Sequence, residues 1–107
     1  MRAILCSDWG EPETLTLSEA PSPVAGSGEV TLRVRMAGVN FADIVLVRGQ
    51  YQEKPMLPFS PGLEAAGEVL TVGEGVTGIA PGDRVMAVPG VGAFAEEVEH
   101  CALVRVA

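Results

Sequence analysis

Hydrophobic and polar residues alternate along much of the chain, which is the pattern of β-strands with one buried face. The alternation is cleanest over residues 29–36. The expected buried face of this strand carries Val30, Leu32, Val34 and Met36. The expected solvent face carries Thr31, Arg33 and Arg35. Shorter apolar runs predict further strands over residues 3–6, 14–17, 63–72, 84–88, 94–98 and 101–106.

One segment has the periodicity of a helix. It begins at Asn40, whose side chain can cap the first turn, and Asp43 three residues later can complete a capping box. Gly49, after Arg48, is a typical stop signal. The helix is therefore expected to be about two turns long. Its buried stripe would consist of Phe41, Ile44, Val45 and Val47.

The composition changes this picture little but narrows the fold class. Of 107 residues, 13 are glycine and 8 are proline, whereas aromatic residues make up only 5%. Such a composition favours a turn-rich β fold over a helical bundle. We predict a mainly β protein, a partly open β-barrel with one or two short helices, formed by residues 1–107 as a single domain.

Charge and hydropathy exclude several functional classes. The net charge is −7, and no segment gathers lysines or arginines into a basic stripe, so nucleic acid and anionic membranes are not expected as partners. The longest uncharged run, residues 85–95, falls far short of the roughly 20 residues that span a bilayer. The N-terminus carries no signal-peptide hydrophobic region. Cys6 and Cys101 are expected to be buried free thiols in a cytoplasmic protein.

Three sequence blocks carry a family resemblance. They are residues 38–51, which contain GVNFAD and RGQY, residues 57–67, LPFSPGLEAAG, and residues 81–85, PGDRV. In order and spacing they resemble the N-terminal GroES-like catalytic domain of medium-chain dehydrogenases/reductases. The most similar branch is that of the zinc-free quinone oxidoreductases, which includes zeta-crystallin.

The resemblance implies an enzyme without zinc. Zinc-dependent alcohol dehydrogenases of this superfamily have a cysteine where Asn40 stands and a histidine where Leu63 stands. An amide oxygen is a poor zinc ligand and leucine is none. Glu64 remains from that motif, and we expect a partly buried carboxylate held by hydrogen bonds. His100 matches no catalytic position of the family and is expected to be an ordinary surface histidine.

The resemblance also implies that the enzyme transfers a hydride from NADPH to a quinone or an enone, with Asn40 and Tyr51 beside the nicotinamide. Both residues have structural alternatives, because Asn40 can serve only as a helix cap and Tyr51 can simply cover the core. Some quinone oxidoreductases have a further tyrosine where Val45 stands, and this difference weakens the case for a tyrosine proton donor. The turn residues Asp83 and Arg84 are expected to be structural.

The nucleotide-binding half of such an enzyme is missing from these residues. Residues 73–78 have the spacing G-x-G-x-x-G, but the turn at 81–83 follows them instead of a helix, so we interpret them as a hairpin turn. The Rossmann domain that the family places downstream is absent here. We therefore expect this chain alone to hold half of a cleft and to catalyse little or nothing.

Two alternatives remain open. The first is a stand-alone binding module similar to the co-chaperonins that share this barrel, since residues 44–46 are an apolar tripeptide like that of their mobile loop. The predicted helix over these residues opposes it. The second is a regulatory or interaction domain that lacks a catalytic partner. In the isolated reductase domain, the face that would dock the Rossmann domain is expected to expose apolar side chains of the helix, of residues 55–61 and of the last strand, which would favour a homo-oligomer.

Overall fold

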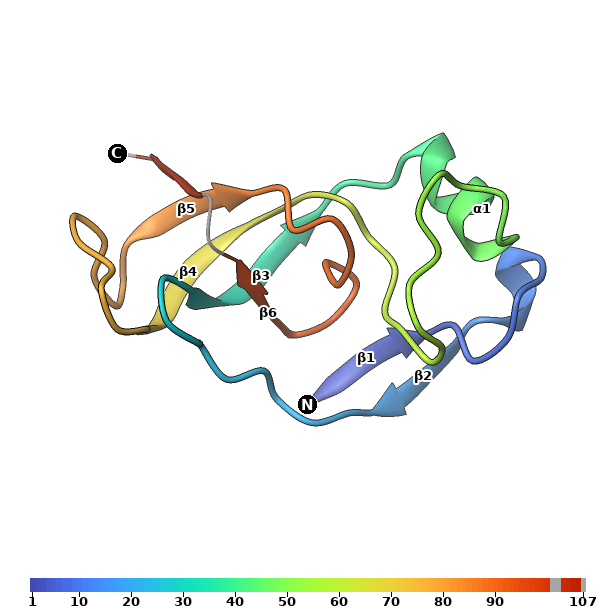
Figure 1. Cartoon of the computed structure of the whole chain (residues 1–107), viewed down its shortest axis with the longest axis horizontal. Helices are drawn as coiled ribbons and strands as arrows, with labels where there is room; N and C mark the ends of the chain where they lie inside the picture. Colours follow the sequence, from blue (N-terminus) through green and yellow to red (C-terminus); the bar gives the residue numbers. More distant parts are fainter. Residues whose placement is uncertain (101–102, 107) are drawn as a thin grey trace.

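The computed structural model of the protein describes residues 1–100 and 103–106 (Figure 1). Two antiparallel sheets and one α-helix make up the fold of these residues. Helix α1 is Phe41–Val47, and a 3-10 turn, η1, is Pro12–Thr14. The strands are β1 Arg2–Leu5, β2 Thr16–Glu19, β3 Val30–Ala37, β4 Ala65–Val72, β5 Arg84–Ala87, β6 Glu97–His100 and β7 Leu103–Val106. The predicted fold class, mainly β with one or two short helices, is confirmed.

The larger sheet has the strand order β6-β3-β4-β5-β7, and β1 and β2 form the smaller one. In Figure 1, α1 lies above the small sheet at the opposite end of the molecule from the C-terminus. Six apolar side chains form the core of the large sheet: Val30, Leu32, Val69, Val85, Ala87 and Val98. A second cluster, which we call the helix cluster, contains Cys6, Leu46, Val47 and Phe59.

Strand β3 has the predicted position but not the two predicted faces. Thr31 is only 2% exposed, whereas Met36 is 75% exposed. The pairing of β3 with β4 shifts register between Thr31 and Leu32 and again between Val34 and Met36, so the alternation of faces is interrupted. The Thr31 hydroxyl lies 2.6 Å from that of Thr71, and this hydrogen bond makes its burial tolerable. The predictions were wrong at Thr31 and at Met36.

Two other strands are displaced from their predicted positions. The chain around residue 14 forms η1 before β2 begins, because the amides of Thr14 and Leu15 donate backward to carbonyls at 3.0 and 3.1 Å. Before β6, the amide of Phe94 donates to the carbonyl of Pro61 at 2.9 Å, and Ala95 forms only an isolated bridge with Ala3. Local and long-range hydrogen bonds thus take amides that a continuous ladder would need.

The helix also differs from its predicted stripe. Phe41 is 76% exposed, while Leu46, which was not assigned to the stripe, is 1% exposed in the helix cluster. Cys6 is buried as expected, and its Sγ lies 3.2 Å from the carbonyl oxygen of Asp8. Burial raises the pKa of this thiol above its ordinary value. Cys101 lies outside the described residues.

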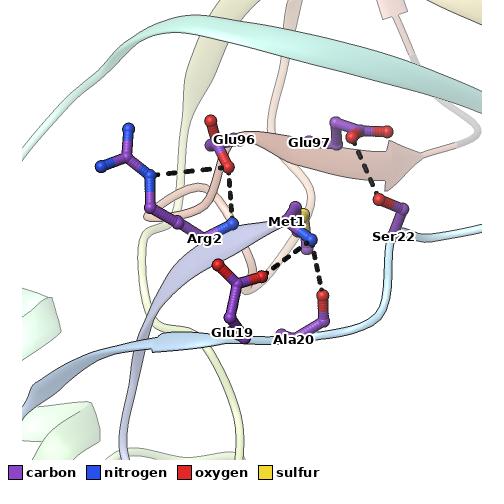
Figure 2. Close-up of polar contacts among 7 residues, drawn as sticks. All are labelled: Met1, Arg2, Glu19, Ala20, Ser22, Glu96 and Glu97. Carbon is purple, nitrogen blue, oxygen red and sulfur yellow. Dashed lines mark hydrogen bonds and ion pairs between the residues drawn. The ribbon is translucent and has the colours of Figure 1, made fainter.

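Polar contacts connect the N-terminal segment with residues 96–97, where β6 begins (Figure 2). The ammonium group of Met1 donates to the carbonyl of Ala20 at 2.8 Å, and the amide of Arg2 donates to the Glu96 carboxylate. The Ser22 hydroxyl donates to Glu97 at 3.1 Å. The bond from Arg2 lowers the pKa of Glu96. The bonds of Arg2 and Ser22 therefore connect the segment of the small sheet with the beginning of β6.

Candidate functional site

The first turn of α1 holds the candidate residue Asn40. Asn40 and Asp43 form the predicted capping box. In this box the Asn40 amide donates to Asp43 Oδ2 at 2.8 Å. The Asp43 amide also donates to the main-chain carbonyl of Asn40 at 3.0 Å, a bond of the first helical turn. Asp43 is 6% exposed, and its Oδ1 is buried without a hydrogen-bond partner among the described residues. Asn40 itself is half-buried, so its backbone is fixed while its side chain lies at the border between core and solvent.

The second candidate, Tyr51, follows the C-terminal end of the helix. Gly49 has a φ of +73°, which reverses the chain, and the amide of Gln50 donates to the carbonyl of Val45 at 3.0 Å. Tyr51 then begins a bend over residues 51–53 and is 36% exposed. The structure therefore places Asn40 and Tyr51 at opposite ends of one short helix.

The structure also contains a cavity on the five-stranded sheet. The sequence did not predict this cavity. We call it the sheet cavity, and its volume is about 680 Å³. Its lining is Met36, Ala37, Gly38, Glu64, Ala65, Ala66, Met86, Ala87, Val88 and His100. Neither Asn40 nor Tyr51 belongs to this lining, although Gly38 is only two residues before Asn40. The cavity is apolar apart from Glu64 and His100.

Glu64 was expected to be partly buried and held by hydrogen bonds, and this expectation was wrong. The side chain is exposed at the sheet cavity and lies against Gly38. A Cβ atom at Gly38 would overlap the Glu64 carboxylate, so the absence of a side chain there is what leaves room for it. His100 is half-buried and lines the same cavity, a more specific position than the surface histidine expected.

The residues at the two expected ligand positions, Asn40 and Leu63, do not fit a zinc site. Within residues 1–100 and 103–106, no three His, Cys, Asp or Glu side chains lie together closely enough to hold a metal ion. Leu63 packs against the helix cluster, and Asn40 takes part in the helix cap. Both positions that would carry the Cys and His ligands therefore serve packing and capping. No helix of the described part is long and apolar enough to cross a membrane.

The turn at residues 81–83 has the structural role expected of it. Asp83 Oδ2 accepts a hydrogen bond from the amide of Ala80 at 3.0 Å and lies 4.0 Å from Arg105 Nη1. The tripeptide 44–46 lies inside α1, and Leu46 is buried there. This geometry agrees with the predicted helix and differs from a mobile loop that presents its apolar residues to a partner.

Residues 26–106 match the family model of the alcohol dehydrogenase GroES-like domain. The chain belongs to this family. The GroES-like domain is 52% identical over 97 residues to quinone oxidoreductase-like protein 2 of Mus musculus, covering 90% of this chain and 27% of that protein. It is 41% identical over 100 residues to the synaptic vesicle membrane protein VAT-1 homolog of Homo sapiens, covering 92% of this chain and 25% of that protein.

Solved structures give the same assignment. The human synaptic vesicle membrane protein VAT-1 homolog-like protein superimposes with a TM-score of 0.95 at 33% identity, over 100% of this chain and 35% of that one. The Escherichia coli quinone oxidoreductase complexed with NADPH superimposes with a TM-score of 0.92 at 32% identity, over 100% of this chain and 33% of that one. The GroES-like domain described here thus spans about a quarter to a third of the length of its relatives.

Proposed function

We propose that this GroES-like domain is the substrate-side half of an NADPH-dependent, zinc-independent oxidoreductase that transfers a hydride to a quinone or an enone. The observation that carries the proposal is the match over the whole chain with a quinone oxidoreductase solved with NADPH. A Rossmann domain would supply the main cofactor contacts. The buried free thiol of Cys6 supports a cytoplasmic location.

In this reaction the main task of the protein is to position the substrate and the cofactor. When bound, NADPH would supply the hydride, and the reduced quinone or enone would take its proton from solvent or from a hydroxyl in the cleft. Asn40 can orient a carbonyl or an amide, because its carboxamide offers both a donor and acceptors. Its backbone is already fixed by the bond to Asp43, so only its side-chain torsions would have to be ordered. Tyr51 adds one hydroxyl at the other end of α1.

The donor set supports chemistry without zinc. Asn40 and Leu63 replace the two most specific ligands, and the described residues contain no cluster of three ligating side chains. Elemental analysis of the purified protein tests this part. We expect less than about one zinc per ten chains, whereas one tightly held zinc per chain would place the protein in the metal-dependent branch.

Turnover tests the function as a whole. The full-length protein should oxidise NADPH only when a quinone or an enone is present, measured by the loss of nicotinamide absorbance. Residues 1–107 alone should show no turnover, because they lack the glycine-rich pyrophosphate site. If the full-length protein binds NADPH but reduces neither class of acceptor, the proposed reaction is wrong.

A further inference from the structure

Trp9, the only tryptophan of the chain, packs against the first end of the bend that carries Tyr51 and lies near the Lys54 ammonium at the second. Before the bend, a Cβ atom at Gly49 would lie 3.0 Å from Trp9 Cδ2, so the indole packs directly on the glycine backbone. After the bend, Lys54 Nζ lies 6.0 Å from the centroid of the same ring. The indole also packs against the Phe59 ring of the helix cluster, with ring centroids 5.8 Å apart.

The residues after Trp9 are fastened to the end of α1. The amide of Gly10 donates to the carbonyl of Val47 at 3.0 Å. The Arg48 guanidinium donates to both carboxylate oxygens of Glu11 at 2.9 Å, a two-bond arrangement with fixed geometry. Segment 9–11 therefore joins the helix end to the loop that follows it, and we call it the Trp9 brace.

Besides the hydrogen bond from the Gln50 amide to the Val45 carbonyl, few contacts of the described residues fix the bend. Residues 50–54 are all exposed, and Tyr51 belongs to neither hydrophobic cluster. Exposed bends that lack packed side chains sample several conformations, so the place of Tyr51 depends on how the two ends of its bend are held. Trp9 packs against the first end at Gly49, and at the second end the Lys54 ammonium lies near its ring.

We propose that Trp9 is a positioning residue for Tyr51, and that the Trp9 brace sets the distance of the Tyr51 hydroxyl from the substrate. This rests on the proposed function, in which Tyr51 lies in the reductase cleft. A brace of this kind acts through geometry, because a small misplacement of a cleft group lowers turnover even when the fold is intact.

The first test measures the bend itself in the full-length protein. Chymotrypsin cleavage after Tyr51, followed by mass spectrometry under native conditions, should accelerate by about tenfold in Trp9→Leu, because an unbraced bend opens more often. Val69→Ala is the matched control: it removes buried apolar volume from the other cluster, and cleavage after Tyr51 should stay within about twofold of wild type. Equal rates in wild type and Trp9→Leu would overturn the brace.

The second test is a double-mutant cycle in the same protein, with NADPH and benzoquinone. Trp9→Leu should lower kcat/KM by about fivefold when Tyr51 is present and by less than about twofold in the Tyr51→Phe background, because its effect passes through the hydroxyl. A purely structural role would give the same loss in both backgrounds. Equal losses, or no loss in either, would therefore refute the proposal.

The two tests separate the brace from the proposed function. A wild-type protein that reduces no quinone would defeat the function, and the cleavage rates would still decide whether the brace holds the bend. If the wild-type protein is active and Tyr51→Phe is equally active, the Tyr51 hydroxyl takes no part in catalysis. Trp9 then has no positioning role. If Trp9→Leu does not fold, Trp9→Phe keeps an aromatic ring of smaller contact area, with the same expected signs.

Discussion

Asn40 caps helix α1, and we propose that it also orients a ligand. The capping box fixes the chain at the start of α1, and Asp43 is buried in doing so. The cap could be predicted from the sequence because it depends on residue types three positions apart, which is local information. Whether the carboxamide also faces a ligand depends on groups distant in the chain. The local sequence pattern does not contain this information.

Substitutions at Asn40 separate the two roles. Asn40→Asp keeps a good helix cap, so the midpoint of thermal unfolding should stay within a few degrees of wild type, whereas Asn40→Ala should cost about 1 kcal/mol. In the full-length enzyme, Asn40→Asp should lower kcat/KM by about tenfold, because a carboxylate removes the donor and adds charge. Unfolding curves and steady-state kinetics measure both. Full activity of Asn40→Asp would leave this residue as a cap only.

Among the elements, the pair β3 and β4 best illustrates what the sequence could and could not predict. Alternation identified β3 and an apolar run identified β4, but neither pattern showed the register shifts of β3. The sheet cavity depends on that register, because Met36 pairs with Ala66 and Ala66 pairs with Met86, which brings two methionines 50 positions apart into one row across the sheet. Cross-strand rows are set by long-range pairing, so the pattern along one strand does not contain them.

The close approach of β3 to β4 makes a strong prediction at Gly67. A Cβ atom there would overlap the carbonyl oxygen of Arg33, so Gly67→Ala should force the two strands apart and lower the free energy of unfolding by about 3 kcal/mol or more. Gly10→Ala is the matched control, since a Cβ at Gly10 would make only ordinary contacts of 3.5 Å with Thr14. It should be neutral or stabilise by up to about 1 kcal/mol. Urea unfolding of both variants measures the difference, and equal stabilities would contradict this account of the sheet.

The ion pair that joins η1 to α1 predicts a dependence on pH. Its hydrogen bonds from Arg48 lower the pKa of Glu11 below the ordinary value of 4.5. A carboxyl with a lowered pKa in the folded state stabilises the fold above its ordinary pKa, and the contribution is lost as the pH falls through the lowered value. Glu11→Gln should therefore lose stability at neutral pH and approach wild type in acid.

Thermal unfolding between about pH 7 and pH 3 measures this difference. The effect should be small and weaker at high salt, because the pair lies at the surface. Glu53→Gln is the control: it removes an exposed carboxyl that no hydrogen bond or ion pair of the described residues engages, so its unfolding curve should follow wild type across the range. A Glu11→Gln variant that stays equally far below wild type at every pH would mean that the side chain acts by packing instead of charge.

On the scale of the whole molecule, several large apolar side chains are exposed around the sheet cavity. Met36, Met86 and Val88 are 75%, 50% and 68% exposed around the sheet cavity. Val39 and Phe41, which follow the lining residue Gly38 in the sequence, are 83% and 76% exposed. The sequence predicted exposed apolar residues on α1, and the structure adds the edge of the cavity. Because the relatives are three to four times longer, this face is where we expect further polypeptide to pack.

Without such a partner, the chain should associate with itself. In sedimentation velocity, the weight-average sedimentation coefficient of residues 1–107 should rise with concentration toward the millimolar range. This is expected although the net charge of −7 opposes association. Met86→Lys places a charge at the cavity and should shift the association to about tenfold higher concentration. Leu17→Lys is the matched control, since Leu17 is 65% exposed on β2, away from the cavity, and it should not alter the association. A chain that stays monomeric at every concentration, or that responds equally to both lysines, would show that this apolar face does not drive association.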